Sequence, residues 1–560
     1  MSGPVEIEAV LAAYEAAAQR PWTGLYPHGL VAPDPGALTA LDLFNAAPRQ
    51  AEAVFYFDAA QTYGDVDLSS GRLAGWLHGR GVTRGDRVAL ILQNTPQFLI
   101  ATVAAWKLGA IVVTLNPMYR EPELAKLFAD CRPKAAICHD DQWPLVAKAA
   151  EGVMAPDLVL WTSGREMQGR DDDRVLPARA GAPVGRALAC ALAQASVAPP
   201  PSALAPEDVG LLLYTSGTTG APKGAMLTHR NLVANALLAK QAFELTRASR
   251  IFGVAPLFHV TGFELQLVAA FAAGASQVLT YRFQPAVVLE AFLERRPTFI
   301  IGAITAFIAL MNQPQASADH FASFAHLYSG GAPIAPAVID AFAQRFGRSI
   351  RSSYGMTELT APSHLAPTQG PIPVDPLSGA LSIGVPTPGV DAIIVDDLRR
   401  PLGSGQHGEV VVRGPGVMAG YWGKPQETEE VLVGGWMHTG DIGFVDDAGW
   451  FYLVDRKKDM ISASGFKVWP REVEDVLYAY PGVREAAVVG APDPYRGETV
   501  VAFVSAQPGA ALDVTALAAH CRERLAAYKQ PAEIRLLDDL PKTATGKITR
   551  NTLKRDLPDR

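Results

Sequence analysis

A run of hydroxyl, glycine and lysine residues, YTSGTTGAPKG at 214–224, is the strongest chemical signal in the sequence. Glycines let backbone N–H groups approach an oxyanion closely, hydroxyls donate further hydrogen bonds, and a lysine adds a compact positive charge. This composition suits a polyphosphate. The run is not a Walker A loop, which requires Gly-Lys-Ser/Thr, because Pro222 precedes Lys223 and Gly224 follows it. On composition alone, an ordinary Gly/Ser/Thr-rich turn is an equally good interpretation.

Three later segments carry a charged side chain in a short loop of small residues. Glu358 ends the segment SYGMTE, where a carboxylate could hold Mg²⁺ against a phosphate. Asp441 ends the segment HTGD, and its carboxylate could accept the hydroxyls of a ribose. Lys547 ends the segment PKTATGK. Taken singly, the three are equally well explained as a capped loop, a strand-end turn and a solvated lysine.

Together and in this order, the segments resemble the motifs of the acyl-adenylate-forming superfamily, which includes acyl-CoA synthetases, peptide-synthetase adenylation domains and luciferases. The matching stretches are YTSGTTGAPKG, SYGMTE, HTGD, DRKKDMISASGFKVWPREVE and PKTATGKI. The resemblance covers roughly Leu41 to Lys554. It implies an enzyme that uses ATP and Mg²⁺ to convert a carboxylic acid to an acyl-adenylate and then transfers the acyl group to coenzyme A. The fourth stretch looks most similar to bacterial fatty-acid–CoA ligases for medium or long chains.

The resemblance implies a role for each matching residue. Lys547 is expected to reach the α-phosphate and the acyl carboxylate, Lys223 to bind phosphate, and Lys458 to be the hinge between two domains. Thr218 and Glu358 are the expected metal ligands. The full set of expected ATP contacts is Thr215, Ser216, Gly217, Thr218, Thr219, Gly220, Ala221, Pro222, Lys223, Gly331, Ala332, Pro333, Ser353, Tyr354, Gly355, Met356, Thr357, Glu358, Asp441, Arg456 and Lys547.

The segment after the hinge implies the coenzyme A half of the reaction. The matching positions are Ser464, Gly465 and Phe466 in a turn that lines the pantetheine channel, and Lys467, Arg496 and Lys529 at the CoA nucleotide. Three cations suit the phosphates of that nucleotide. Each cation, taken singly, is more simply explained as an exposed surface residue.

The segment APLFHVTGF at 255–263 resembles the motif that lines the acyl pocket, so the expected acyl contacts are His259, Val260 and Phe263. A core histidine with satisfied hydrogen bonds is a nearly equal explanation for His259. Phe263 stands where some long-chain enzymes carry a tryptophan, which leaves the chain length open. The Ala-rich segment Leu265–Ala272 leaves volume beside it and favours a medium- or long-chain fatty acid.

Four alternatives stay open at this point. An aryl-acid–CoA ligase would share the chemistry and differ in the pocket. An adenylating enzyme could load a carrier protein instead of CoA. A luciferase-like monooxygenase would consume O₂. A non-catalytic nucleotide-binding regulator would be expected to lack Glu358, Asp441 or Lys547, and all three residues are present.

The elements that must position these residues alternate between helix and strand. A helix is expected at 67–80, and apolar strands at 87–92 and 111–115 between helices predict an α/β fold of mostly parallel sheets covered by helices. The segment Gly164–Asp208 is predicted to be a long surface connection. The chain becomes strand-rich after Gly389, and a charged run at 455–459 suggests a boundary. The expected division is a large N-terminal domain of βα-rich sheets with a β-rich end, residues 1–457, and a small, mobile α+β domain, residues 458–560.

Composition narrows the class of protein. The chain has 560 residues, 49% of them hydrophobic and 19% charged, so it can bury large cores and is not expected to be disordered. A formal net charge of −7 argues against a nucleic-acid partner. The four cysteines form no CxxC pair, and neither a secretory signal nor a membrane-spanning run is apparent. We therefore expect buried or free thiols and a cytoplasmic enzyme whose partners are an acid and CoA, with a homodimer left open.

Overall fold

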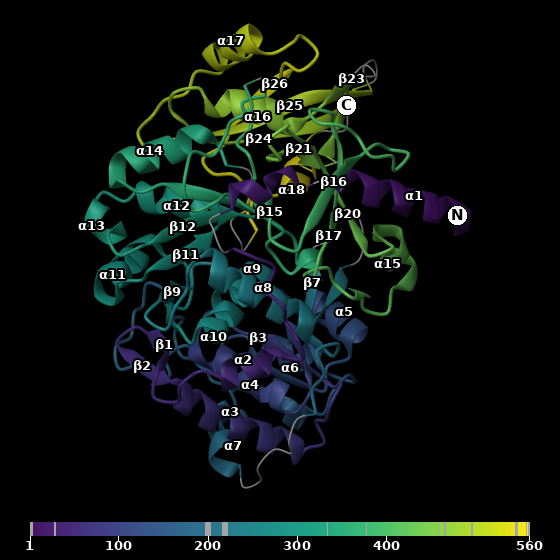
Figure 1. Cartoon of the computed structure of the whole chain (residues 1–560). Coiled ribbons are helices and arrows are strands. Elements are labelled where there is room, and N and C mark those ends of the chain that lie inside the picture. Colours follow the sequence, from purple (N-terminus) through teal and green to yellow (C-terminus); the bar gives the residue numbers. More distant parts are fainter. Residues whose placement is uncertain are drawn as a thin grey trace.

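Two large sheets with helices on their faces form the greater part of the molecule (Figure 1). The computed structural model describes residues 4–18, 20–26, 30–195, 203–215, 222–332, 334–376, 378–456, 459–463, 466–493, 497–543, 547–555 and 557. Mostly parallel strands between helices confirm the α/β class that the apolar runs predict.

The first sheet has nine strands among the described residues, in the order β15-β14-β13-β12-β11-β9-β10-β1-β2. Its strands are β1 (Glu52–Tyr56), β2 (Ala59–Thr62), β9 (Arg250–Phe252), β10 (Ser276–Leu279), β11 (Phe299–Gly302), β12 (His326–Gly330), β13 (Ile350–Tyr354), β14 (His364–Leu365) and β15 (Val385–Pro386). The pairs from β1 to β13 are parallel, and β2, β14 and β15 pair antiparallel at the edges. Parallel pairing brings the carboxyl ends of β12 and β13 side by side.

The second sheet has seven described strands, in the order β18-β8-β7-β4-β3-β5-β6. They are β3 (Arg87–Ile91), β4 (Ile111–Thr114), β5 (Ala135–His139), β6 (Val159–Thr162), β7 (Val209–Thr215), β8 (Lys223–Thr228) and β18 (Gly420–Tyr421). β7 and β8 form an antiparallel pair, so the two ends of the glycine- and hydroxyl-rich run, Thr215 and Lys223, lie opposite each other.

Most helices of the large domain pack on these two sheets, whereas the first helix packs on the antiparallel sheet described next. In α4 (Pro96–Lys107) every residue from Pro96 to Trp106 is buried, which explains a helix that is apolar on all sides. The other helices are α1 (Pro4–Ala17), α2 (Ala40–Asn45), α3 (Tyr63–His78), α5 (Glu121–Cys131), α6 (Trp143–Ala149), α7 (Leu188–Gln194), α8 (His229–Ala242), α9 (Val260–Gly262), α10 (Ala269–Ala273), α11 (Pro285–Arg295), α12 (Ile304–Met311), α13 (Ala318–Phe321), α14 (Pro336–Phe346) and α15 (Pro425–Val431).

A third, antiparallel sheet ends the large domain and confirms the predicted strand-rich segment. Its described strands are β16 (Asp391–Val395), β17 (Gly408–Arg413), β19 (Leu432–Val433), β20 (Trp436–Val445) and β21 (Phe451–Arg456). β20 pairs with both β17 and β21, so Asp441 lies opposite Arg456.

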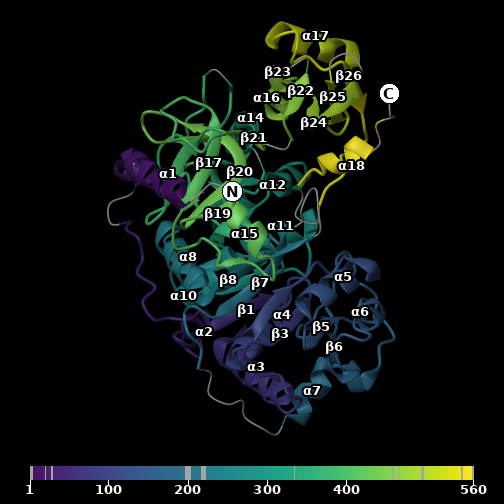
Figure 2. The same ribbon diagram turned by 90° about the vertical axis from the view of Figure 1, so that its right-hand side faces the viewer.

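The small domain lies at one end of the molecule (Figures 1 and 2). Its elements are β22 (Ile461–Ala463), β23 (Phe466–Val468), α16 (Pro470–Tyr478), β24 (Val483–Asp493), β25 (Gly497–Ala506), α17 (Val514–Arg524), β26 (Glu533–Leu536) and α18 (Arg550–Arg555). In Figure 2, α18 lies below this sheet, on the side that faces the large domain. Sheet membership therefore changes between Arg456 and Ile461, within the predicted charged run.

Two predicted elements need correction. Helix α3 begins at Tyr63 and not near Asp67, because the Thr62 hydroxyl accepts the Asp65 N–H while the Asp65 carboxylate accepts the Thr62 N–H. The predicted surface connection 164–208 contains α7, in which Leu188 and Ala191 are buried, and Val175 is also fully buried. Apolar residues among many Ala and Pro were enough to form these packed contacts.

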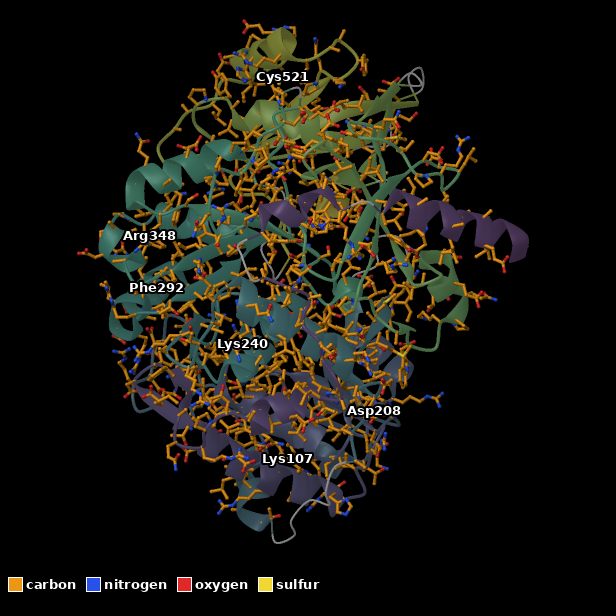
Figure 3. The ribbon with its side chains drawn as sticks, in the orientation of Figure 1. Lys107, Asp208, Lys240, Phe292, Arg348 and Cys521 are labelled. Carbon is orange, nitrogen blue, oxygen red and sulfur yellow. The ribbon has the colours of Figure 1, made fainter. Side chains whose placement is uncertain are left out.

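The four cysteines, Cys131, Cys138, Cys190 and Cys521, are free thiols, as expected. Figure 3 shows Cys521 in the small domain, at the opposite end of the molecule from Lys107 in α4. Within the described ranges, no helix combines the length and apolarity needed to cross a bilayer.

Candidate active site

The expected phosphate loop begins and ends on paired strands. Thr215 ends β7, Lys223 begins β8, and the two residues lie opposite each other. The Thr215 hydroxyl donates to the Lys223 carbonyl at 3.3 Å. Pro222 is exposed, and residues 216–221, which include Thr218, lie outside the described part of the chain. The structure therefore places the lysine of the loop at the edge where β18 joins β8.

Tyr421 links Lys223 to Glu358, and the sequence analysis did not find it. It lies in β18, opposite Ala225 of β8. The Lys223 ammonium is 5.1 Å from the centre of the Tyr421 ring, within cation–π range. The Tyr421 hydroxyl donates to Glu358 Oε1 at 2.9 Å. Burial and the Glu358 carboxylate raise the pKa of Tyr421, so its hydroxyl stays a donor.

Several of the expected ATP contacts lie at the carboxyl ends of β12 and β13. Tyr354 ends β13, and its hydroxyl donates to Asp441 Oδ2 at 2.7 Å. Both side chains are buried. The residues that follow β12 and β13 in the expected set are Gly331, Ala332, Gly355, Met356 and Thr357; Pro333 lies outside the described residues, and only the backbone of Arg456 is described.

Lys547 reaches this group from the small domain. The ends of its loop are joined by the Lys547 N–H to the Thr543 hydroxyl at 3.1 Å and the Thr543 N–H to the Lys547 carbonyl at 2.7 Å. A Cβ placed on Gly331, whose φ is +79°, would lie 3.2 Å from Lys547 Cε and 3.7 Å from Nζ. Glycine therefore serves twice at 331, in permitting the backbone angle and in leaving room for the lysine.

His259 lies near the same lysine. Burial, and then the positive charge of Lys547, lower the pKa of His259 to about 3. The imidazole is therefore neutral at neutral pH, and its Nδ1 accepts the Thr261 N–H at 3.4 Å. The structure thus brings the expected adenylation lysine, the nucleotide segments and the acyl segment together from two domains.

Asn94 holds the acyl segment in place, and it too was missed. Its side-chain amide donates to the carbonyls of Gly253 at 2.8 Å and Ala255 at 3.0 Å, and its Oδ1 accepts the Leu257 N–H at 2.8 Å. Asn94 is buried and more than 150 residues away along the chain, so no local pattern could have revealed this contact.

The residues after His259 form a buried helical wall. Val260 is buried in α9, and Phe263 begins a π-helical turn, Phe263–Val268. The Phe263 ring packs against Phe98 and Trp106, at centroid distances of 6.2 and 6.0 Å. Glu264 is fully buried in this turn and has no hydrogen-bond partner among the described residues. Burial raises the pKa of Glu264 and so disfavours its charged form; the sequence analysis did not consider this acid group.

The expected CoA residues are described only in part. Lys529 forms an ion pair with Glu472 of α16. Ala463 and Phe466 pair across the hairpin of β22 and β23, and Ser464 and Gly465 between them lie outside the described residues. Arg496 and Lys458 also lie outside them, and the side chain of Lys467 is not described. The expected roles of these residues stay predictions.

The donor set fits a magnesium nucleotide better than a resident metal. The described residues contain no group of three or more histidine, cysteine or carboxylate side chains able to hold a metal ion. Mg²⁺ on a nucleotide needs only one or two protein carboxylates, because phosphates and water supply the other ligands. Glu358 meets that need, because it is buried and accepts the Tyr421 hydroxyl, whose ring also contacts Lys223.

Family models match both parts of the chain. The model described as AMP-binding enzyme matches residues 43–422, and the one described as AMP-binding enzyme C-terminal domain matches residues 472–547.

Named relatives extend over nearly the whole chain. A long-chain-fatty-acid–CoA ligase of Bacillus subtilis (strain 168) is 34% identical over 96% of this chain and 98% of its own length. A feruloyl-CoA synthase of Amycolatopsis sp is 35% identical over 90% of this chain and 96% of its own length.

Solved structures share the fold. The crystal structure of ATP-bound MatB from Rhodopseudomonas palustris has a TM-score of 0.82 at 28% identity, covering 92% of this chain and 99% of that chain. The anthranilate CoA ligase AuaEII in complex with anthranoyl-AMP has a TM-score of 0.81 at 27% identity, covering 93% and 97%.

Proposed function

The chain belongs to the AMP-binding enzyme family as an AMP-forming acyl-CoA synthetase, and we propose that its acid is a medium- or long-chain fatty acid. ATP and CoA are its other substrates. The observation that carries the acid-activating function is the position of Lys547, which lies against Gly331 and close to His259. This lysine is where the acid carboxylate and the α-phosphate of ATP would have to meet.

The first step joins two anions, so positioning and charge neutralisation are its main requirements. The carboxylate is ionised near neutral pH and needs no general base. Its oxygen attacks the α-phosphorus, and the bond to pyrophosphate breaks. Lys547 and Lys223 supply positive charge, and Tyr354 and Asp441 would orient adenine and ribose. Glu358 would hold Mg²⁺, which neutralises phosphate charge when bound.

The second step requires the same acyl carbonyl to meet the thiol of CoA. The thiol sulfur attacks the carbonyl carbon, and AMP leaves. Lys547 and the turn at 464–465 cannot occupy one crowded site together, so we infer that the small domain rotates at Lys458 between the two steps. The sheets change between Arg456 and Ile461, which supports a hinge in this interval.

The acyl segment supports an apolar acid. Burial and Lys547 lower the pKa of His259 to about 3, so this side chain is neutral near pH 7. Burial raises the pKa of Glu264 and disfavours its charged form. A segment that disfavours charge does not favour a second carboxylate on the substrate. The match to the Bacillus ligase over 96% of the chain supports a fatty acid.

An aryl acid is the second candidate. The feruloyl-CoA synthase of Amycolatopsis sp is as similar in sequence, and the aromatic contacts of Phe263 with Phe98 and Trp106 stiffen one wall of the acyl segment.

Mg²⁺ dependence, a cytoplasmic location and a homodimer stay predictions.

The experiment is a panel of acids with one readout for each half-reaction. Pyrophosphate release without CoA reports adenylation, and CoA-dependent AMP release reports thioester formation. Straight-chain acids of increasing length are compared with benzoic and hydroxycinnamic acids. We expect the highest kcat/KM with medium or long chains. A preference for aromatic acids would replace the fatty acid by the second candidate, and turnover only with an added carrier protein would exclude CoA.

A further inference from the structure

Arg550 lies three residues after Lys547, at the start of α18, and forms ion pairs with three carboxylates. Its Nη2 donates to both oxygens of Glu474 at 2.8 Å. Its Nη1 donates to Asp455 Oδ1 and to Asp459 Oδ2, each at 3.1 Å. Asp455 and Glu474 are both buried. So many charge-assisted bonds on one guanidinium fix the start of α18, and with it the loop that carries Lys547.

The three carboxylates come from the two sides of the proposed hinge. Asp455 is part of β21, which pairs with β20 in the last sheet of the large domain. Asp459 follows the hinge, and Glu474 lies in α16 of the small domain. Asp455 is therefore the one of the three that connects Arg550 to the large domain.

Asp455 also binds the small domain through its second oxygen. Oδ2 accepts the N–H of Arg471, near the start of α16, at 2.9 Å. The Arg471 guanidinium donates to the carbonyl of Ile334 in the large domain at 3.3 Å. One carboxylate of the large domain thus binds both α16 and α18, the two helices that face it.

We propose that Asp455, Arg471 and Arg550 form a hinge latch, which holds Lys547 in the adenylating position and must open before thioester formation. The proposal rests on the two-step function given above. A rotation at Lys458 separates Asp455 from both arginines, because Asp455 stays with β21. Arg550 keeps Glu474 and Asp459, so the rotation leaves no buried unpaired guanidinium, which would be far more costly. Arg550 is thus a positioning residue, acting through Lys547.

The test compares two carboxylates that accept the same Nη1 at the same distance. The contact of Arg550 with Asp455 spans the hinge, and its contact with Asp459 does not. For Asp455→Asn we expect adenylation, measured as pyrophosphate release, to slow about tenfold, while thioester formation from supplied acyl-adenylate and CoA stays within about twofold of wild type. For the matched control Asp459→Asn we expect the ratio of the two rates to stay within about twofold of wild type. The acid is whichever one the wild type activates fastest, so a wrong substrate class does not affect the comparison.

A second variant guards against misfolding. Arg550→Lys keeps the positive charge but loses the planar guanidinium, which binds Glu474 through Nη2 and Asp455 and Asp459 through Nη1. We expect the same selective loss of adenylation, with a thermal midpoint that reports whether the fold is retained. Equal losses in both half-reactions in the folded variants would overturn the latch, and so would a change of the same size in Asp459→Asn. An unchanged adenylation rate in Asp455→Asn would overturn it as well.

Discussion

The two domains are stabilised by different kinds of contact. Among the described residues, the largest fully buried side chains, from Tyr14 to Trp436, all belong to the large domain. The small domain has a core of Val, Ala, Leu and Ile, and ion pairs surround it, including Arg550–Glu474, Arg471–Asp475 and Lys542–Glu485.

Several contacts between the domains follow the second pattern. Asp455 with Arg550 and Arg471 with the Ile334 carbonyl are charged or polar contacts. Trp469 of the small domain adds an apolar contact, because it packs against a buried cluster at the end of the large domain. Separating apolar surfaces costs about 25 cal/mol for each Å² exposed, whereas separated charges exchange their partners for water at a small net cost. The polar contacts of this interface can therefore open and close more easily than apolar ones. This supports the proposed motion of the small domain against the large domain, which is called the platform below.

The strongest test of this comparison removes the positive charge of Lys547, which the small domain places against the large domain. We expect Lys547→Ala to slow adenylation about 10²- to 10³-fold, because one preorganised charge at the developing transition state is lost. Thioester formation from supplied acyl-adenylate should be spared. The two half-reactions are measured separately, and Lys542→Ala, five residues earlier in the small domain, is the control. Equal losses in both half-reactions would contradict a role of Lys547 in adenylation alone.

The platform can be tested through its buried carboxylate. We expect Glu358→Gln to raise the Mg²⁺ concentration needed for half-maximal adenylation about 10- to 100-fold. The amide keeps the size of the side chain and can still accept from the Tyr421 hydroxyl. Tyr421→Phe removes that donor and should have a smaller effect. A metal requirement that does not change in Glu358→Gln would exclude Glu358 from the metal site.

Buried histidines make the platform sensitive to acid. Burial lowers the pKa of His229 to about 4 and that of His364 to about 3. In the unfolded chain, a histidine has a pKa of about 6.5. The unfolded state then binds more protons than the folded state below about pH 6.5. The contribution of these histidines to the free energy of unfolding is therefore complete above that pH and falls as the pH drops towards 4. Each histidine contributes a slope of about 1.4 kcal/mol per pH unit.

The measurement is urea denaturation at a series of pH values for wild type and His364→Gln. We expect the variant to lose about 1.4 kcal/mol per pH unit of the slope between pH 6 and 4. An unchanged slope would mean that this histidine is protonated in the folded state.

Glu264→Gln is expected to have the smallest effect on activity. Burial raises the pKa of Glu264 in the folded state above its unfolded value of about 4.3. The folded state then binds more protons than the unfolded state, so the wild type loses stability as the pH rises from the unfolded pKa towards the folded pKa. The glutamine has no such dependence. The variant should therefore be more stable than wild type at pH 7 and similar near pH 4, as measured by urea denaturation. Its acid preference should not change, and a shifted preference would show that Glu264 contacts the substrate.

Much of the architecture could be predicted from local patterns. The apolar runs that became β3 and β4 predicted parallel strands, and the strand-rich pattern after Gly389 predicted the strands of the third sheet. The bounds of α3 and the packed segment around Val175 were wrong, because a capping box and a few buried side chains decided them. The π-helical turn beginning at Phe263 left no periodic pattern that differs from an ordinary helix over so few residues.

The sequence by itself determined the chemistry of this protein. Lys223, Glu358, Asp441 and Lys547 could be named because each lies in a short motif, and the glycines and hydroxyls of a motif act over a few residues of backbone. Only the tertiary structure decided which of these groups meet. Tyr421 contacts Glu358 across 63 residues, and Arg550 contacts Asp455 across 95. Such contacts depend on how strands and helices pack, because a hydrogen bond between distant residues leaves no periodicity in the chain.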